Sequence, residues 1–174
     1  MKRLFFLGLA IVLSLTACQK TEKRYTQQSV EIDTYKKVID AYEKQDWEAL
    51  MSHYADTAKI MNNVIDKEGK TIAEEVAIGK EDAALFSSWD YVDGESEYEM
   101  VVTDKGQTWV NFWGIWKGTL AANNKTYTLP THITAQFVDG KVVKEFGYWD
   151  VSKIMMDIQT MEQAELSTMK DTIN

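Results

Sequence analysis

The chain has 174 residues, with 19 basic against 27 acidic residues and a formal net charge of −8 at pH 7. Such a charge disfavours nucleic acid and anionic lipid head groups as partners, because both are themselves negative. The length suits one domain of common size. Cys18 is the only cysteine, so an internal disulfide is excluded and the core alone must stabilise the fold.

The first 17 residues have the features of a bacterial secretory signal. Lys2 and Arg3 precede a short apolar run over 4–15, which is too short for a membrane-spanning helix of about 20 residues. Cleavage near Ala17 that releases a soluble protein is one interpretation. However, Leu15-Thr16-Ala17-Cys18 resembles the lipobox of bacterial lipoproteins. That resemblance implies that Cys18 is lipidated and anchors an exported protein to a membrane of the cell envelope, facing the periplasm or the cell surface.

Composition divides the rest of the chain into three segments. Residues 18–28 are polar and rich in lysine, and we interpret them as the lipidated cysteine followed by a flexible tether. Residues 29–162 form the predicted domain. Residues 163–174 are a polar tail that we expect to fray.

Helices are predicted at the start of the domain. Apolar residues recur at helical spacing in two sets: Tyr35, Val38, Ile39 and Tyr42, then Trp47, Leu50, Met51 and Tyr54. Asp46 is a good N-cap for the second set, so we expect two amphipathic helices or one bent helix. A short strand over 58–62 and a further helix from Lys80 to about Trp89 follow.

Strand patterns replace helical ones after Gly94. The expected strands cover 95–103, 108–120, 127–138 and 141–149, and Asp139-Gly140 is a strong two-residue hairpin signal. A last helix is expected after Asp150. Helices followed by antiparallel strands indicate an α+β fold with the helices packed on one sheet face.

The hairpin turn predicts which residues share a sheet face. If Val138 pairs with Lys141, an apolar face forms that the helices should cover. This face comprises Ile133, Ala135, Phe137, Val142, Phe146 and Tyr148, with Asp150 just beyond. The more polar opposite face comprises His132, Thr134, Gln136, Val143, Glu145 and Trp149.

The strand over 108–120 carries large apolar groups on both faces. Phe112 and Trp116 should point one way, and Trp109, Trp113 and Ile115 the other. A sheet with one face in water should not show this pattern. Either a pocket lies on one side with core on the other, or a partner subunit covers the outer face. We expect the second to contribute and therefore predict a homodimer formed through the outer face of the sheet.

Several short motifs together resemble NTF2-like proteins of the SnoaL-like kind. They are Asp46-Trp47-Glu48-Ala49-Leu50, His53-Tyr54-Ala55-Asp56, Gly79-Lys80-Glu81-Asp82-Ala83, Phe137-Val138-Asp139-Gly140-Lys141-Val142 and Tyr148-Trp149-Asp150. The resemblance spans roughly residues 30–157. It implies a cone-shaped α+β barrel in which a curved antiparallel sheet wraps around the N-terminal helices and leaves a pocket, with a C-terminal helix. Proteins of this kind include polyketide cyclases, ketosteroid isomerases and dehydratases, so the fold does not fix the function.

Asp150 is the candidate acid–base residue. The resemblance implies this role for an aspartate in the closing segment, and an aromatic pocket would raise the pKa of such a carboxyl group. Asp150 also directly precedes a predicted helix, where aspartate is a favoured N-cap. His132 is the candidate partner, although the predicted register places it on the opposite face.

A pocket for a flat apolar or aromatic ligand could be lined by five aromatic residues, which could equally be ordinary core: Tyr54, Phe112, Trp113, Trp116 and Tyr148. We find no metal-ligand spacing and no nucleotide fingerprint, so no cofactor is expected. The leading hypothesis is a lipid-anchored module that binds a small apolar ligand. The alternatives are a cofactor-free enzyme of the cyclase, isomerase or dehydratase kind using Asp150, and a protein-interaction module using the outer sheet face.

Overall fold

The computed structural model describes residues 24–173. The predicted signal segment, Cys18 and the first part of the tether lie outside the described residues. A seven-stranded sheet holds β1 (Tyr25–Thr26), β2 (Tyr54–Asn62), β3 (Phe86–Tyr91), β4 (Glu97–Val102), β5 (Thr108–Leu120), β6 (Lys125–Val138) and β7 (Lys141–Tyr148). The helices are α2 (Val30–Glu43), α3 (Trp47–Ser52), η1 (Asp66–Glu68), α4 (Ile72–Leu85) and α5 (Ser152–Ile173). None of the helices described is long and apolar enough to cross a membrane.

The strands run in the order β1-β4-β5-β6-β7-β2, and β3 also pairs with β5. Every pair is antiparallel except β2 with β7, which is parallel. The sheet is therefore mixed, and the prediction of a purely antiparallel sheet was wrong at this edge. The parallel pair arises because β2 leaves the end of α3 and returns along the last strand, bringing Tyr54 beside Val142.

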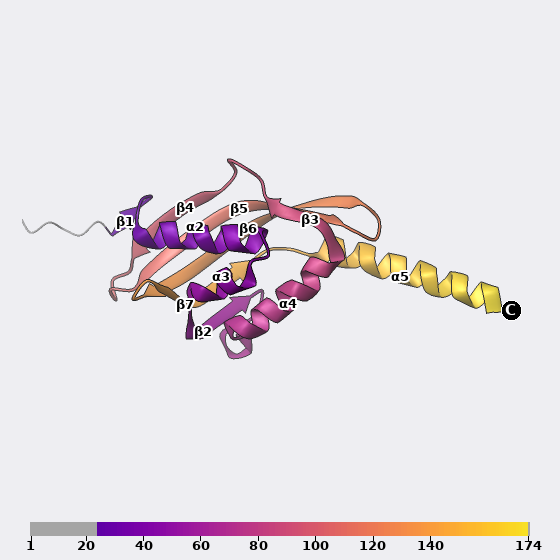
Figure 1. Cartoon of the computed structure of the whole chain (residues 1–174), viewed down its shortest axis with the longest axis horizontal. Coiled ribbons are helices and arrows are strands. Elements are labelled where there is room, and N and C mark those ends of the chain that lie inside the picture. Colours follow the sequence, from indigo (N-terminus) through magenta and orange to yellow (C-terminus); the bar gives the residue numbers. More distant parts are fainter. Residues whose placement is uncertain (1–23, 174) are drawn as a thin grey trace, which may run out of the picture.

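Helices α2 and α3 cover one face of the curved sheet, and α4 crosses near β2 (Figure 1). The α2 helix begins at the N-cap Ser29, whose hydroxyl accepts from the amide of Ile32. Its buried side packs on the sheet through Ile32, Tyr35, Val38, Ile39 and Ala41. The core therefore lies between these helices and the inner face of the sheet, as the α+β prediction requires.

The α4 helix differs from its prediction at both ends. It begins at Ile72 because Thr71 and Glu74 form a capping box, in which each side chain accepts from the other's backbone amide. It ends at Leu85, and Phe86–Tyr91 is strand β3 rather than the predicted end of a helix. Along β3, Trp89 and Tyr91 are buried at alternate positions, as strand geometry requires.

A β-bulge shifts the register of the β6–β7 hairpin. Val138 pairs with Lys141 and Phe137 with Val142, as predicted, but Gln136 then pairs with Lys144. Val143 is the extra residue, so every later residue of β7 lies on the face opposite to its prediction. Glu145 is inside, whereas Phe146 and Tyr148 are outside.

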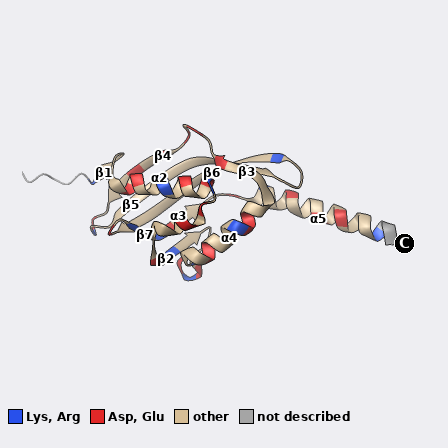
Figure 2. Cartoon of the chain, in the orientation of Figure 1, with Lys and Arg blue, Asp and Glu red and all other residues tan. Residues whose placement is uncertain are grey.

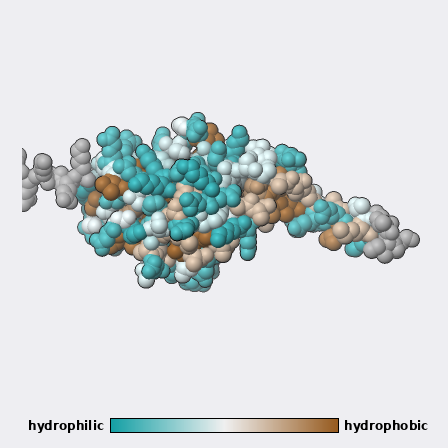
Figure 3. All heavy atoms as spheres, in the orientation of Figure 1, coloured by the Kyte–Doolittle hydropathy of each residue, from teal (hydrophilic) through white to brown (hydrophobic). Residues whose placement is uncertain are grey.

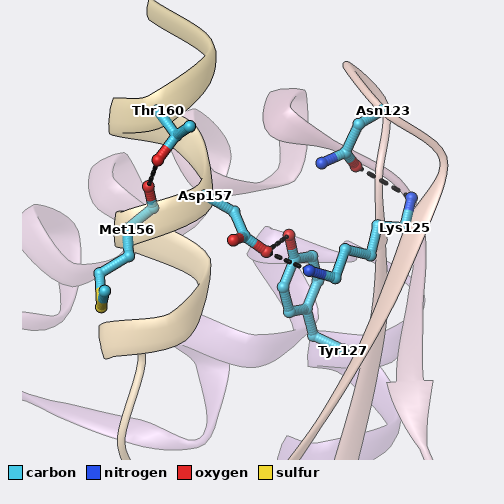
Figure 4. Close-up of polar contacts among 6 residues, drawn as sticks. All are labelled: Asn123, Lys125, Tyr127, Met156, Asp157 and Thr160. Carbon is cyan, nitrogen blue, oxygen red and sulfur yellow. Dashed lines mark hydrogen bonds and ion pairs between the residues drawn. The ribbon is translucent and has the colours of Figure 1, made fainter. Parts of the chain in front are cut away.

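The α5 helix runs through the predicted polar tail and extends away from the body of the domain (Figure 1). Its first turns pack on the domain through Ile154 and Ile158. Figure 3 shows apolar side chains gathered where this helix leaves the body. One polar contact also holds it, since Asp157 accepts from the ammonium of Lys125 and, over 2.7 Å, from the hydroxyl of Tyr127 (Figure 4).

Candidate functional site

A cavity of about 340 Å³ lies between the inner face of the sheet and the helices α2, α3, α4 and the start of α5. That volume is at the lower end of the range for small-molecule sites. Most of its wall is apolar. The aromatic residues lining it are Tyr35, Tyr42, Trp47, Tyr54, Phe86, Trp89, Tyr91, Trp116 and Trp149.

Glu145 lines this cavity and is a buried carboxylate, since the residue is only 5% exposed to solvent. Its Oε2 accepts hydrogen bonds from the hydroxyl of Tyr54 over 2.7 Å and from that of Tyr35 over 3.0 Å. Its other oxygen, Oε1, accepts none from the residues that the structure describes. One carboxylate oxygen is thus fixed by two donors, and the other makes no hydrogen bond recorded among the described residues.

Burial raises the pKa of Glu145 from 4.5 to about 7. The loss of hydration is the largest cause, and the nearby negative charge of Glu75 acts in the same direction. The hydrogen bonds from Tyr54 and Tyr35 favour the ionised form and oppose the rise. Burial and the charge of Glu145 raise the pKa of both tyrosines well above its usual value, so they remain hydrogen-bond donors.

Two further polar groups of the cavity wall are incompletely bonded. The indole Nε1 of Trp116 is buried and makes no hydrogen bond among the described residues. Burial raises the pKa of Tyr42, and the nearby indole N–H of Trp116 partly opposes that rise. Asn62 donates to Glu75 over 2.5 Å, while its own Oδ1 accepts nothing from the part of the chain described. A buried donor without an acceptor is costly, so Trp116 is a natural contact for a ligand oxygen.

Only some of the candidate site residues predicted from the sequence line the cavity. Tyr54 and Trp116 line the cavity, as predicted. Phe112 is fully buried on the predicted side, but it packs against Tyr91 and Tyr98 in the core rather than lining the cavity.

The other aromatic candidates lie on the outer face of the sheet. Trp113 is 40% exposed and Tyr148 is 53% exposed, and the ring of His132 stacks between them. One ring nitrogen of His132 bonds to the backbone oxygen of Phe112. The structure thus gives His132 the outward position that its strand register predicted and no place in the cavity. For Tyr148, the bulge at Val143 reverses the predicted face.

Asp150 does not lie where the register predicted. It is exposed, it does not line the cavity, and its carboxylate accepts from the backbone amide of Ser152, the first residue of α5, over 2.8 Å. Hydrogen bonding from the side chain of Ser152, and then from its backbone amide, lowers the pKa of Asp150. The physical reason is again the bulge, which turns the end of β7 over, so Asp150 serves the start of a helix rather than the cavity.

Sequence reasoning missed Glu145 and Trp149, because both were assigned to the outer face. The adjacent apolar pair Val142-Val143 is the signal that could have revealed the slip, since regular alternation would place only one of the two inside. Gly147 completes the local arrangement: a Cβ there would come within 2.4 Å of Trp149 and 2.3 Å of Asn62. Among the described residues, no group of three or more metal-binding side chains is present.

Comparison with known proteins identifies the fold but no close relative. No protein-family model and no curated protein matches the chain. Among solved structures, it is similar to a "putative SnoaL-like polyketide cyclase" from Shewanella denitrificans, with 13% identity, a TM-score of 0.58, and coverage of 76% of this chain and 99% of the other. It is also similar to an NTF2-like protein of unknown function from Burkholderia pseudomallei, with 14% identity, a TM-score of 0.57, and coverage of 74% and 97%.

A third similar structure is a protein from Catenulispora acidiphila with a ketosteroid isomerase-like fold, solved in complex with trimethylamine. It has 10% identity, a TM-score of 0.55, and coverage of 69% of this chain and 87% of the other. At such identities the likeness establishes the fold alone. The chain has the NTF2-like cone fold, in which a curved sheet and helices enclose a cavity.

Proposed function

We propose that this domain is a cofactor-free acid–base enzyme of the cyclase or isomerase kind, with Glu145 as its base. The observation that carries the proposal is a buried carboxyl group with a pKa of about 7 that opens on an aromatic cavity. A general base works best when its pKa lies near the working pH. Strongly perturbed carboxyl groups in cavities are also typical of functional sites.

The chemistry would be proton removal from a carbon next to a carbonyl group. Oε1 of Glu145 takes the proton and the electron pair of the C–H bond moves to the carbonyl oxygen, forming an enolate. The proton then returns at another carbon of the conjugated enolate. In a cyclisation, the enolate carbon instead attacks a second carbonyl carbon of the substrate, whose C=O π bond breaks and whose oxygen takes the proton from Glu145. Tyr35 and Tyr54 hold the carboxylate through Oε2, and the unpartnered N–H of Trp116 supplies a donor for a substrate oxygen.

This proposal replaces Asp150 with Glu145 and the passive binding module with a reactive one. An apolar binding pocket alone gives no reason for an ionisable group held by two tyrosines, since burying a charge is costly. The fold of polyketide cyclases and ketosteroid isomerases supports acid–base chemistry, but only as an analogy. The predicted anchor at Cys18 remains part of the proposal, and it would place the cavity outside the cytoplasm, where cofactor-free chemistry is suitable.

Hydrogen–deuterium exchange at carbon tests the chemistry without knowledge of the natural substrate. A panel of small aromatic ketones is incubated in D₂O with the full-length protein in lipid nanodiscs, and NMR follows the loss of the α-proton signal. We expect faster exchange than in buffer for at least one ketone, and a loss of about 10²-fold or more in Glu145→Gln. Equal exchange by wild type and Glu145→Gln would contradict the proposal. Asp150→Asn is the matched control and should exchange at the wild-type rate.

The anchor has a separate test. Growth of the producing cells with radiolabelled palmitate should label the wild-type protein and leave Cys18→Ser unlabelled. Blocking lipoprotein signal cleavage should also leave the precursor uncut. Unchanged maturation under that block would contradict the lipoprotein assignment and leave the role of Glu145 unaffected.

A further inference from the structure

The charges around the cavity are of one sign. Glu75, Asp82 and Glu145 all line it, and no described lining residue is lysine, arginine or histidine. The ion pairs recorded for the described residues involve Asp40, Asp66, Asp104 and Asp157, so none of them neutralises the cavity carboxylates. Glu75 acts on Glu145 as a like charge and raises its pKa. The wall thus holds negative charge without a compensating cation.

The aromatic part of the wall has the composition of a cation site. The ring of Tyr42 stacks on that of Trp89 with 4.9 Å between the ring centroids. The ring of Trp47 packs against that of Trp89 with an angle of 85° between the ring planes. The rings of Phe86 and Trp116 have centroids 5.3 Å apart and planes at 88° to each other. All of these rings line the cavity, and aromatic ring faces attract cations, as in the aromatic sites that bind quaternary ammonium groups.

No cation of the described part of the chain occupies that aromatic wall. The cation–π contacts recorded are Lys36 with Tyr98, Lys125 with Tyr127 and Lys144 with Phe146, and none of these rings lines the cavity. Figure 2 shows acidic positions along the ribbon of α4, the helix that supplies Glu75 and Asp82. The unpartnered Nε1 of Trp116 is a second, independent sign that the space is built for a ligand.

We infer that the ligand of this cavity is an organic cation, a quaternary or protonated amine whose charged nitrogen lies among Tyr42, Trp89 and Trp116 near Asp82. The inference deepens the proposed function. It rests on that function only for the orientation of the rest of the ligand, which we place toward Glu145. Neutral hydrocarbons would fill the same space without balancing the carboxylates.

Three molecules of nearly equal shape test the inference. Choline, neutral 3,3-dimethylbutan-1-ol and anionic 3,3-dimethylbutyrate are titrated into the full-length protein in nanodiscs, with tryptophan fluorescence and calorimetry as readouts. We expect choline to bind about tenfold or more tightly than the alcohol, and the anion to bind least. Equal binding of choline and the alcohol, preference for the anion, or no binding of choline at tens of millimolar would each overturn the inference.

Variants locate the binding. Asp82→Asn should weaken choline binding by about threefold or more, whereas Glu81→Gln, next to it but not lining the cavity, should change it less than twofold. Trp89→Leu should weaken choline binding, and Trp113→Leu on the outer face should not. If Trp89→Leu fails to fold, the Asp82 and Glu81 pair still decides the matter. Unchanged choline affinity in Asp82→Asn would contradict the proposed position of the charged nitrogen near Asp82.

The experiments can reject the acid–base chemistry and the cationic ligand independently of each other. Exchange of neutral ketones that depends on Glu145, without selective binding of choline, would sustain the acid–base chemistry and reject the cationic ligand. Selective choline binding without any Glu145-dependent exchange would do the reverse.

Discussion

The hydroxyl of Tyr54 donates a 2.7 Å hydrogen bond to Oε2 of Glu145, although the two residues are 91 positions apart. The parallel pairing of β2 with β7 makes this contact, because Tyr54 opens β2 beside Val142 of β7. Tyr35 reaches the same oxygen from α2. Three elements therefore converge on one carboxylate, which is the arrangement expected of a functional group rather than of a core residue.

Removing one of these donors should move the pKa of Glu145 further upward. In Tyr54→Phe the hydrogen bond that favours the ionised carboxylate is lost, so its midpoint should rise above 7. The acid limb of any pH–rate profile should shift to higher pH in the same direction. Tyr148→Phe, on the outer face, is the control and should leave the profile unchanged. A downward shift in Tyr54→Phe would contradict this account of the hydrogen bond.

The raised pKa of Glu145 also predicts how stability depends on pH. The folded protein holds the proton between pH 4.5 and about 7, whereas the unfolded chain releases it. The contribution of Glu145 is therefore fully present below pH 4.5 and is lost as pH rises through about 7. For a shift of this size the loss is roughly 3 kcal/mol.

Urea unfolding of wild type and Glu145→Gln at pH 5 and pH 8 measures that contribution. The free energy of unfolding of the glutamine variant, relative to wild type, should rise by about 2–3 kcal/mol between the two pH values. Glu81→Gln, exposed on α4, should follow wild type. Parallel pH profiles for wild type and Glu145→Gln would mean that the carboxyl group titrates normally.

The polar contact of Asp157 with Lys125 and Tyr127 should control how firmly α5 closes the cavity (Figure 4). The first turns of α5 line the cavity through Val151, Ile154 and Ile158. In Asp157→Asn the ion pair is lost, so amide exchange over the first half of α5 should accelerate several-fold and ligand should dissociate faster. Glu162→Gln, further along the same helix, is the control. Unchanged protection of α5 would show that apolar packing alone holds it.

The outer face of the sheet remains the predicted homodimer surface. It exposes Trp113 and Tyr148 on either side of His132. Light scattering on the unlipidated protein should give the mass of a dimer, and Trp113→Arg should lower it to that of a monomer, because a buried unpaired charge is costly. A monomeric mass for the wild type at all concentrations would contradict the prediction.

Several elements could be predicted from the sequence because their signals are local. The strand over 108–120 matches β5, and the Asp139-Gly140 hairpin turns where it was expected. The α+β class and the inward position of Trp116 follow from local spacing and alternation. Tyr54 lies inside as predicted, but it is the first residue of β2 and not the end of the predicted helix. The resemblance to SnoaL-like proteins gave the cone fold, although the parallel edge strand was missed.

The proposed base, Glu145, could not be predicted, because its position depends on one extra residue. Without the bulge at Val143, Glu145 would belong to the polar outer face and Phe146 to the core. The bulge is visible only in the strand pairing, where Gln136 lies opposite Lys144 instead of Val143. The same slip made Asp150 look like a cavity residue. Residues at functional sites often depart from the local sequence pattern, because their positions are selected for function.

The pKa of Glu145 is the most direct test of the central claim that this carboxyl group is the base of an acid–base site. The side-chain carboxyl signals of glutamates can be followed by ¹³C NMR from pH 4 to pH 9, with Glu145→Gln identifying the one signal that belongs to Glu145. We predict a midpoint near 7, with the signal moving further when ligand enters the cavity. A midpoint near 4.5 would show an ordinary solvated carboxylate and would contradict the account.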